Sequence, residues 1–164
     1  MNDLVPEALS FREGMSRLGA AVNLVATDGV AGRHGLTVSA VCSVTDSPPT
    51  LLVCINRKSF SHDAFMENGV LSVNVLSDEH QGLSQTFSRR IEGDRFDFGQ
   101  WESRASGAPC LVDAAVSFDC RIADVSLRGT HSVLFCHVLD TRLRTGDSGG
   151  LIWFRRGFHP LACH

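Results

Sequence analysis

The sequence lacks most features of nucleic-acid-binding, secreted and membrane-spanning proteins. Lys58 is its only lysine, and its longest basic runs are the pairs Arg89–Arg90 and Arg155–Arg156. Nucleic-acid binding depends on clustered Lys and Arg, and the formal net charge is −3, so no nucleic-acid partner is expected. The N-terminus has no basic-then-apolar signal, and no apolar run reaches about 18 residues. We therefore expect a cytoplasmic protein with no membrane partner.

The six cysteines contain no Cys-x-x-Cys pair, and four of them lie within apolar strand patterns. A free thiol in such a place behaves as a small hydrophobe, so reduced structural thiols in a reducing compartment are expected. His159, Cys163 and His164 offer an alternative as metal ligands near the C-terminus. No fourth ligand lies within reach of that tail, so we predict no metal site.

No strand–helix–strand nucleotide fingerprint occurs, which argues against a doubly wound fold. The length of 164 residues fits a single domain, residues 1–164. The expected fold class is mainly β with peripheral helices, as a closed or nearly closed barrel. Strands are expected at residues 20–27, 36–45, 50–55, 70–76, 114–125, 130–143 and 151–154. Helices are expected at residues 6–18, 62–68 and 77–87, and residues 88–106 should form a long surface segment.

Residues 36–45 alternate between an apolar face and a face of short hydroxyl side chains. A solvated strand would usually carry Lys, Glu or Arg on its outer face. Short hydroxyls instead suit a surface against which a flat polar ligand or another backbone lies closely. The alternative is that this is simply the wet face of an edge strand.

The apolar run 50–55, which we expect to be buried on both faces, leads into a polar loop at residues 56–61. The loop reads Asn-Arg-Lys-Ser-Phe-Ser and directly precedes an expected helix. An amide, two cations and two hydroxyls before a helix are favourable for binding a phosphate. An ordinary polar loop is the alternative.

Five motifs resemble, in the same order, those of short-chain flavin reductases. The motifs are TVSAVCSVTDSPPTLLVCINRKS, VLSVNVLS, AAVSFDC, GTHSV and GLIWFRRGFHP. This family includes the reductase components of two-component aromatic monooxygenases and the pyrimidine-utilisation flavin reductases. The resemblance implies an FMN-binding split β-barrel that forms a homodimer with flavin near the interface. It also implies an enzyme that reduces FAD or FMN with NADH, or alternatively NADPH, and supplies diffusible reduced flavin to a separate monooxygenase.

The resemblance also implies a set of cofactor-binding residues, with the flavin ring along the strand and its phosphate at the loop. These residues are Thr37, Val38, Ser39, Ala40, Ser43, Cys54, Asn56, Arg57, Ser59, Ser61, Phe87, Ser88 and Arg89. His131 is implied on the nicotinamide side, although a structural histidine is the alternative there. We expect no catalytic side chain, because hydride passes directly from nicotinamide C4 to flavin N5. His137 is expected in the core, and His62, His80 and His159 are expected to be structural.

Two other functions remain open from the sequence. One is a non-enzymatic split barrel that binds flavin or haem as a carrier or stress protein. The other is an enzyme like pyridoxamine-phosphate oxidase, which would normally need a richer basic phosphate cluster than one Lys and one Arg.

Overall fold

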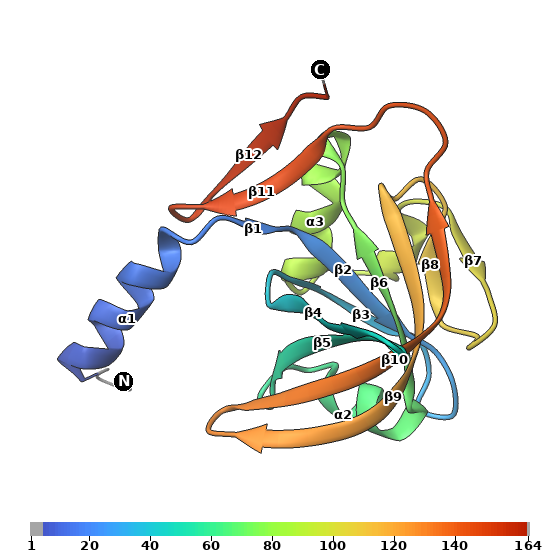
Figure 1. Ribbon diagram of the computed structural model, residues 1–164, viewed down its shortest axis with the longest axis horizontal. Helices are drawn as coiled ribbons and strands as arrows, with labels where there is room; N and C mark the ends of the chain where they lie inside the picture. Colours follow the sequence, from blue (N-terminus) through green and yellow to red (C-terminus); the bar gives the residue numbers. More distant parts are fainter. Residues whose placement is uncertain (1–4, 164) are drawn as a thin grey trace.

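The computed structural model describes residues 5–163, and its centre is a seven-stranded sheet rolled into a barrel (Figure 1). Every neighbouring pair of strands in this sheet is antiparallel. In spatial order the strands are β3 (His34–Val38), β2 (Asn23–Thr27), β6 (Val70–Val75), β9 (Val116–Arg128), β10 (His131–Leu143), β5 (Pro49–Asn56) and β4 (Val41–Asp46). The predicted mainly β class is confirmed.

The barrel closes at a bend in the chain. β3 and β4 lie at opposite ends of the strand order, yet only Ser39 and Ala40 separate them in the sequence. The Val41 N–H donates to the Ser39 carbonyl at 3.0 Å, and the Cys54 N–H donates to the Ala40 carbonyl at 3.0 Å. The two outer edges of the sheet therefore meet at this bend. The prediction of one continuous strand at 36–45 was wrong.

The bend shifts the alternation of side chains by one residue. Leu36 and Val38 contact the barrel core before it, and Val41 contacts the same core after it. Cys42 is consequently exposed, and Val44 is 46% exposed. β5 also differs from its prediction, because only alternate residues such as Val53 are fully buried. Its other face is half-buried, since it borders a groove rather than a second layer of core.

The hydrophobic core has two clusters that meet at β2, which is buried along its whole length. Val25 belongs to the cluster inside the barrel, with Val53 and Phe65. Leu24 belongs to a second cluster outside the barrel, with Leu76 and Phe87. Because successive side chains of a strand point to opposite faces, β2 contributes to both clusters.

Short helices and two small sheets surround the barrel (Figure 1). The helices are α1 (Pro6–Ser16), α2 (His62–Asn68), η1 (Asp78–His80), α3 (Gln81–Ser88) and η2 (Arg95–Asp97). β1 (Ala20–Ala21), β11 (Gly150–Phe154) and β12 (Gly157–Leu161) form one small sheet, and β7 (Trp101–Ser103) pairs with β8 (Pro109–Leu111). None of the described helices is long and apolar enough to cross a membrane.

Several boundaries differ from the prediction for local reasons. The expected helix 77–87 begins instead with the single turn η1, where the Ser77 N–H donates to His80 Nδ1 at 3.1 Å. The expected surface segment 88–106 contains η2 and β7, and Phe96 is buried against Trp101 with ring centroids 4.9 Å apart. β12 was not predicted at all. β7 and β12 are held by pairing with β8 and β11, over three and five residues, and such short ladders leave little periodic pattern in the sequence.

Candidate functional site

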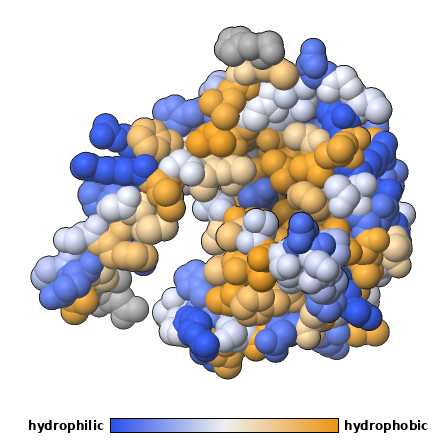
Figure 2. Space-filling view, viewed as in Figure 1, coloured by the Kyte–Doolittle hydropathy of each residue, from blue (hydrophilic) through white to orange (hydrophobic). Residues whose placement is uncertain are grey.

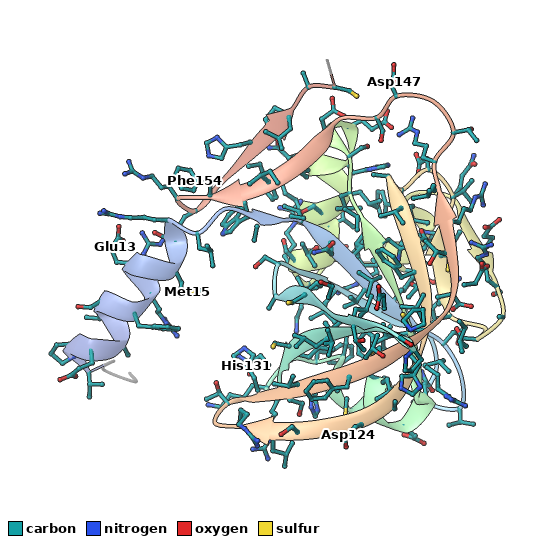
Figure 3. The ribbon with its side chains drawn as sticks, viewed as in Figure 1. Glu13, Met15, Asp124, His131, Asp147 and Phe154 are labelled. Atoms are coloured by element: carbon teal, nitrogen blue, oxygen red, sulfur yellow. The ribbon has the colours of Figure 1, made fainter. Side chains whose placement is uncertain are left out.

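A groove of about 1170 Å³ lies between α1 and the barrel. Figure 2 shows the molecule hollowed there, with hydrophobic residues on both sides. The helix side includes Phe11 and Met15, and Met15 is labelled in Figure 3. Four of the predicted cofactor residues line the barrel side: Ser39, Ala40, Ser43 and Cys54. The groove therefore lies along the bend that closes the barrel.

The turn between β11 and β12 fixes the position of α1 beside this groove. The Arg155 N–H donates to the Ser16 carbonyl at 2.6 Å, and the Arg156 guanidinium donates to the Glu13 carboxylate at 2.9 Å. The hydrogen bond from Arg156 lowers the pKa of Glu13. Arg155 and Arg156 have φ angles of 48° and 60°, a left-handed conformation that is costly outside glycine. The backbone is therefore strained at Arg155 and Arg156, where this turn contacts α1.

The barrel wall of the groove combines an apolar surface with small hydroxyls. Leu52 and Val138 provide apolar surface, while Ser43 and Thr45 provide hydroxyls. This combination suits a planar, amphipathic heterocycle, whose faces are apolar and whose edge is polar. The arrangement fits the ring of a flavin.

Residues 37 and 38 lie differently from residues 39 and 40. The Thr37 hydroxyl donates to the Ser84 carbonyl at 2.6 Å, so it is engaged with α3. Val38 contacts the barrel core. The Thr37 side chain therefore faces α3 and does not line the groove. β3 pairs only with β2, so half of its backbone groups point away from a partner strand.

Cys54 presents a neutral thiol to the groove. Burial raises the pKa of Cys54, and the neighbouring Cys42 thiol raises it further. A thiol with a raised pKa is a poor nucleophile, because the thiolate is the reactive form. Cys54 therefore contributes shape and weak polarity rather than covalent chemistry.

The loop at residues 56–61 is built from nested turns. The Asn56 side-chain carbonyl accepts the Lys58 N–H at 2.9 Å, and the Asn56 backbone carbonyl accepts the Ser59 N–H at 2.9 Å. The Ser61 N–H donates to Ser59 Oγ at 3.4 Å. The side chains of Arg57 and Lys58 are both exposed, so both cations remain accessible to an anion from solvent.

His131 lies directly beside this loop. It is paired with Asn56 across the β5–β10 ladder, and the Arg57 N–H donates to the Thr130 carbonyl at 2.9 Å. His131 Nδ1 is 2.9 Å from the Thr130 hydroxyl. Figure 3 places the residue near the tip of the β9–β10 hairpin, on the side from which α1 projects. The structure thus brings the predicted nicotinamide residue next to the predicted phosphate loop.

The prediction for His137 needs correction, and the structure places Phe87, Ser88 and Arg89 at the C-terminal end of α3. His137 is half-buried, not a core residue as predicted. Phe87 is 1% exposed within the second core cluster, so its side chain is closed to a cofactor. Ser88 and Arg89 are exposed, but the Ser88 hydroxyl donates to the Gln85 carbonyl at 2.9 Å.

A second, separate cavity of about 340 Å³ begins where the loop ends, at Phe60 and Ser61. Its other walls come from residues 33–35 and 90–96, which are distant in the sequence. The sequence analysis did not predict this cavity, because its walls come from three segments that are brought together only by the fold. The one available signal was the aromatic side chain of Phe60 between two serines of a polar loop.

Glu79, His80 and Asp113 place potential metal-ligating atoms within 4.8 Å of one another. His80 Nδ1 accepts the Ser77 N–H, so in the neutral ring the proton lies on Nε2. Nε2 is 3.2 Å from the Asp113 carboxylate, and a nitrogen that carries a proton cannot bind a metal. Arg144 pairs with Glu79 and lowers the pKa of that carboxyl. The cluster is therefore better explained as a structural network of ion pairs and hydrogen bonds than as a metal site.

His164, one of the alternative metal ligands near the C-terminus, lies outside the described residues.

Residues 15–162 match the flavin reductase like domain family. The FMN reductase (NADH) RutF of Pantoea ananatis (strain LMG 20103) is 49% identical over 156 residues, which cover 94% of this chain and 82% of that protein. The FMN reductase (NADH) RutF of Variovorax paradoxus (strain S110) is 51% identical over 160 residues, which cover 97% of this chain and 88% of that protein.

Solved structures that resemble this chain also include flavin reductases. One from Haemophilus somnus 129PT, provisionally assigned as a flavin reductase, has a TM-score of 0.89 and 40% identity, covering 93% of this chain and 98% of that one. BorF, the flavin reductase component of a bacterial two-component tryptophan halogenase, has a TM-score of 0.87 and 25% identity, covering 96% and 99%. These similarities confirm the family resemblance and the fold class predicted from the motifs.

Proposed function

The chain belongs to the flavin reductase like domain family, and on this premise we propose that it is an NADH-dependent FMN reductase. It transfers hydride from NADH to FMN and releases reduced FMN to a separate flavin-dependent monooxygenase. The reductase activity agrees with the function predicted from the motifs. The choice of FMN and NADH, over FAD and NADPH, is supported by the two RutF relatives at about 50% identity, which are FMN reductases that use NADH.

The observation that carries the proposal is the continuity of the groove, the loop and His131. Ser39, Ala40 and Cys54 line the groove, β5 leads from Cys54 directly into the loop, and His131 is paired with Asn56. A flavin ring in the groove would therefore have its ribityl phosphate near Asn56–Ser61. His131 would lie at the edge where nicotinamide approaches.

The protein's own contribution is positioning. FMN supplies the hydride-accepting atom, so the step needs no acid, base or nucleophile from the chain. The small hydroxyls of Ser39 and Ser43 would meet the polar edge of the ring. Arg57 would neutralise the phosphate, a charge-assisted contact worth about 1.5–3 kcal/mol. Holding two rings at near-attack distance is the main source of acceleration in such a site.

We also propose that the protein is a homodimer, with α1 covered by the second copy. α1 has no buried residue, and Leu9, Phe11 and Met15 are 54%, 68% and 47% exposed. Helices of this length are marginal in water unless an apolar face is covered. Figure 1 shows α1 projecting from the barrel, and the groove beside it remains open in one copy. A partner that covers this face would also enclose the flavin.

We also propose that the enzyme acts in the cytoplasm. All six cysteines are free, and three of them are buried within strands. A reducing compartment preserves free thiols. A diffusible reduced flavin also requires the monooxygenase to share the compartment of the reductase.

The experiment is steady-state oxidation of NADH, followed at 340 nm, with FMN, FAD or riboflavin added in excess. We expect many turnovers per protein, saturation with added FMN, and a lower KM for FMN than for FAD. A protein that keeps one flavin through dialysis and does not turn over added flavin would instead be a carrier. Faster turnover with NADPH than with NADH would reverse the assignment of the donor.

A further inference from the structure

The second cavity is a candidate site in its own right. Its lining includes Arg33, His34, Phe60, Arg90 and Arg95, none of which lines the large groove. It adjoins the predicted phosphate loop through Phe60 and Ser61. A molecule bound in the loop could therefore continue into this cavity.

One wall of the cavity is an exposed aromatic platform. Phe60 is 74% exposed, so most of its ring is accessible from solvent. The His34 ring lies 5.5 Å from the Phe60 ring, between centroids, and the Arg90 guanidinium lies 5.7 Å from the Phe60 centroid. An aromatic face flanked by an imidazole and a guanidinium is suited to stacking against a planar base.

The other walls are positively charged. Arg33 is paired with Asp94 at 2.5 Å, and Arg95 donates to the carbonyls of Gly35 and Phe87 at 3.1 and 3.4 Å. Carbonyl groups do not neutralise a guanidinium, so Arg95 keeps a full charge. Among residues 5–163, no carboxylate pairs with Arg90. Three arginines against the single carboxylate of Asp94 leave an excess of two positive charges in the lining.

We propose that this cavity binds the adenosine diphosphate part of a dinucleotide, with the adenine on Phe60 and the diphosphate near Arg90. The aromatic platform matches the base, and the excess charge matches the diphosphate. The inference rests on the proposed function, because NADH and FAD both carry this group and FMN does not. The cavity would then distinguish a dinucleotide from a mononucleotide.

The first test is calorimetric titration of the full-length protein with ADP, which needs no turnover. We expect wild-type protein to bind ADP, and both Phe60→Ala and Arg90→Ala to weaken binding by about tenfold or more. Phe98→Ala and Arg121→Ala are matched controls, because both residues are exposed and lie outside the cavity lining. They should bind ADP like wild type. An absence of ADP binding by the wild-type protein, or equal binding by all variants, would overturn the proposal.

Kinetic measurements then identify the source of the adenosine diphosphate. If NADH is the source, Phe60→Ala and Arg90→Ala should raise the KM for NADH about tenfold. The KM for reduced nicotinamide mononucleotide, which lacks the adenylate, should remain within twofold. If FAD is the source, the affinity for FAD should fall while that for FMN is unchanged. Equal losses for FMN and FAD would show that the cavity belongs to the flavin phosphate site, which contradicts the proposal. A failure of NADH turnover in wild-type protein would count against the proposed function, not against ADP binding.

Discussion

Asn56 and His131 lie directly opposite each other across the β5–β10 ladder. Asn56 begins the polar loop, and His131 follows the tight turn between β9 and β10. The backbone hydrogen bond from Arg57 to Thr130 joins the two turns a second time. The predicted phosphate loop and the predicted nicotinamide residue are therefore fixed relative to each other by the sheet. A reaction that depends on the distance between two stacked rings benefits from such a rigid link.

The first prediction concerns His131→Ala. A residue that only positions a substrate supplies about 1–3 kcal/mol, so kcat/KM for NADH should fall by about tenfold or more. The affinity for flavin should stay within twofold, because the side chain is expected on the nicotinamide side. NADH kinetics at saturating flavin and fluorescence titration with flavin measure the two effects separately.

His137→Ala is the matched control for this prediction. His137 lies six residues further along the same strand, is also half-buried, and lies outside the lining of both cavities. It should leave the NADH parameters unchanged. If His131→Ala instead reduces the affinity for flavin, the residue belongs to the flavin side of the site.

The second prediction concerns the phosphate loop. Arg57→Ala should weaken FMN binding by about 10- to 100-fold, from the loss of a charge-assisted contact worth about 1.5–3 kcal/mol. Riboflavin, which lacks the phosphate, should lose little affinity. Arg121→Ala is the control for the general loss of one exposed positive charge, because Arg121 lies outside the loop and outside the lining of both cavities. Equal losses for FMN and riboflavin, or equal effects of the two substitutions, would show that Arg57 does not contact the phosphate.

The sequence predicted those parts of the fold that repeat along the chain. The strand at residues 130–143 was predicted as a long strand with an apolar middle, and the structure places β10 at His131–Leu143. The helix at residues 62–68 was also confirmed, because Gly69 adopts the left-handed conformation that ends it. In both cases local chemistry alone decides the structure.

The sequence could not predict features that depend on closure of the barrel. Residues 36–45 alternate without interruption, but β3 and β4 pair with different strands and must separate at Ser39–Ala40. Only the three-dimensional order of the strands imposes that break. For the same reason Thr37 faces α3, while Ser39 faces the groove. The resemblance to the family pointed to this stretch of chain, and closure of the barrel decides which of its side chains face the groove.

The third prediction concerns assembly. Phe11→Asp places a charge on the exposed apolar face of α1 and should dissociate the proposed homodimer, since burial of a charge without a partner is costly. Val30→Asp is the control, because Val30 is 84% exposed in a loop away from α1. Sedimentation velocity at micromolar concentration should give a dimer for wild type and Val30→Asp, and a monomer for Phe11→Asp. A monomeric wild-type protein would contradict the proposed dimer.

The last prediction concerns the buried thiols and alkaline pH. Burial raises the pKa of Cys110 and of Cys136 from 9.0 to about 12, and it raises the pKa of Cys120 as well. Between pH 9 and 12 the unfolded chain loses these protons while the folded chain keeps them. The free energy of unfolding should therefore be insensitive to these thiols below pH 9 and should fall as the pH rises above it. Each thiol contributes a slope of about 1.4 kcal/mol per pH unit.

Urea unfolding under reducing conditions at pH 7.5, 9 and 10 measures this slope. The chain contains no tyrosine and only one lysine, so few other groups titrate in the same range. Cys136→Ala should be less stable than wild type at pH 7.5, because it removes a buried side chain, but its stability should fall less steeply above pH 9. Cys163→Ala is the control, since that thiol is exposed and should leave the slope unchanged. If Cys136→Ala and wild type lose stability equally steeply between pH 9 and 10, the Cys136 thiol does not titrate as its burial requires.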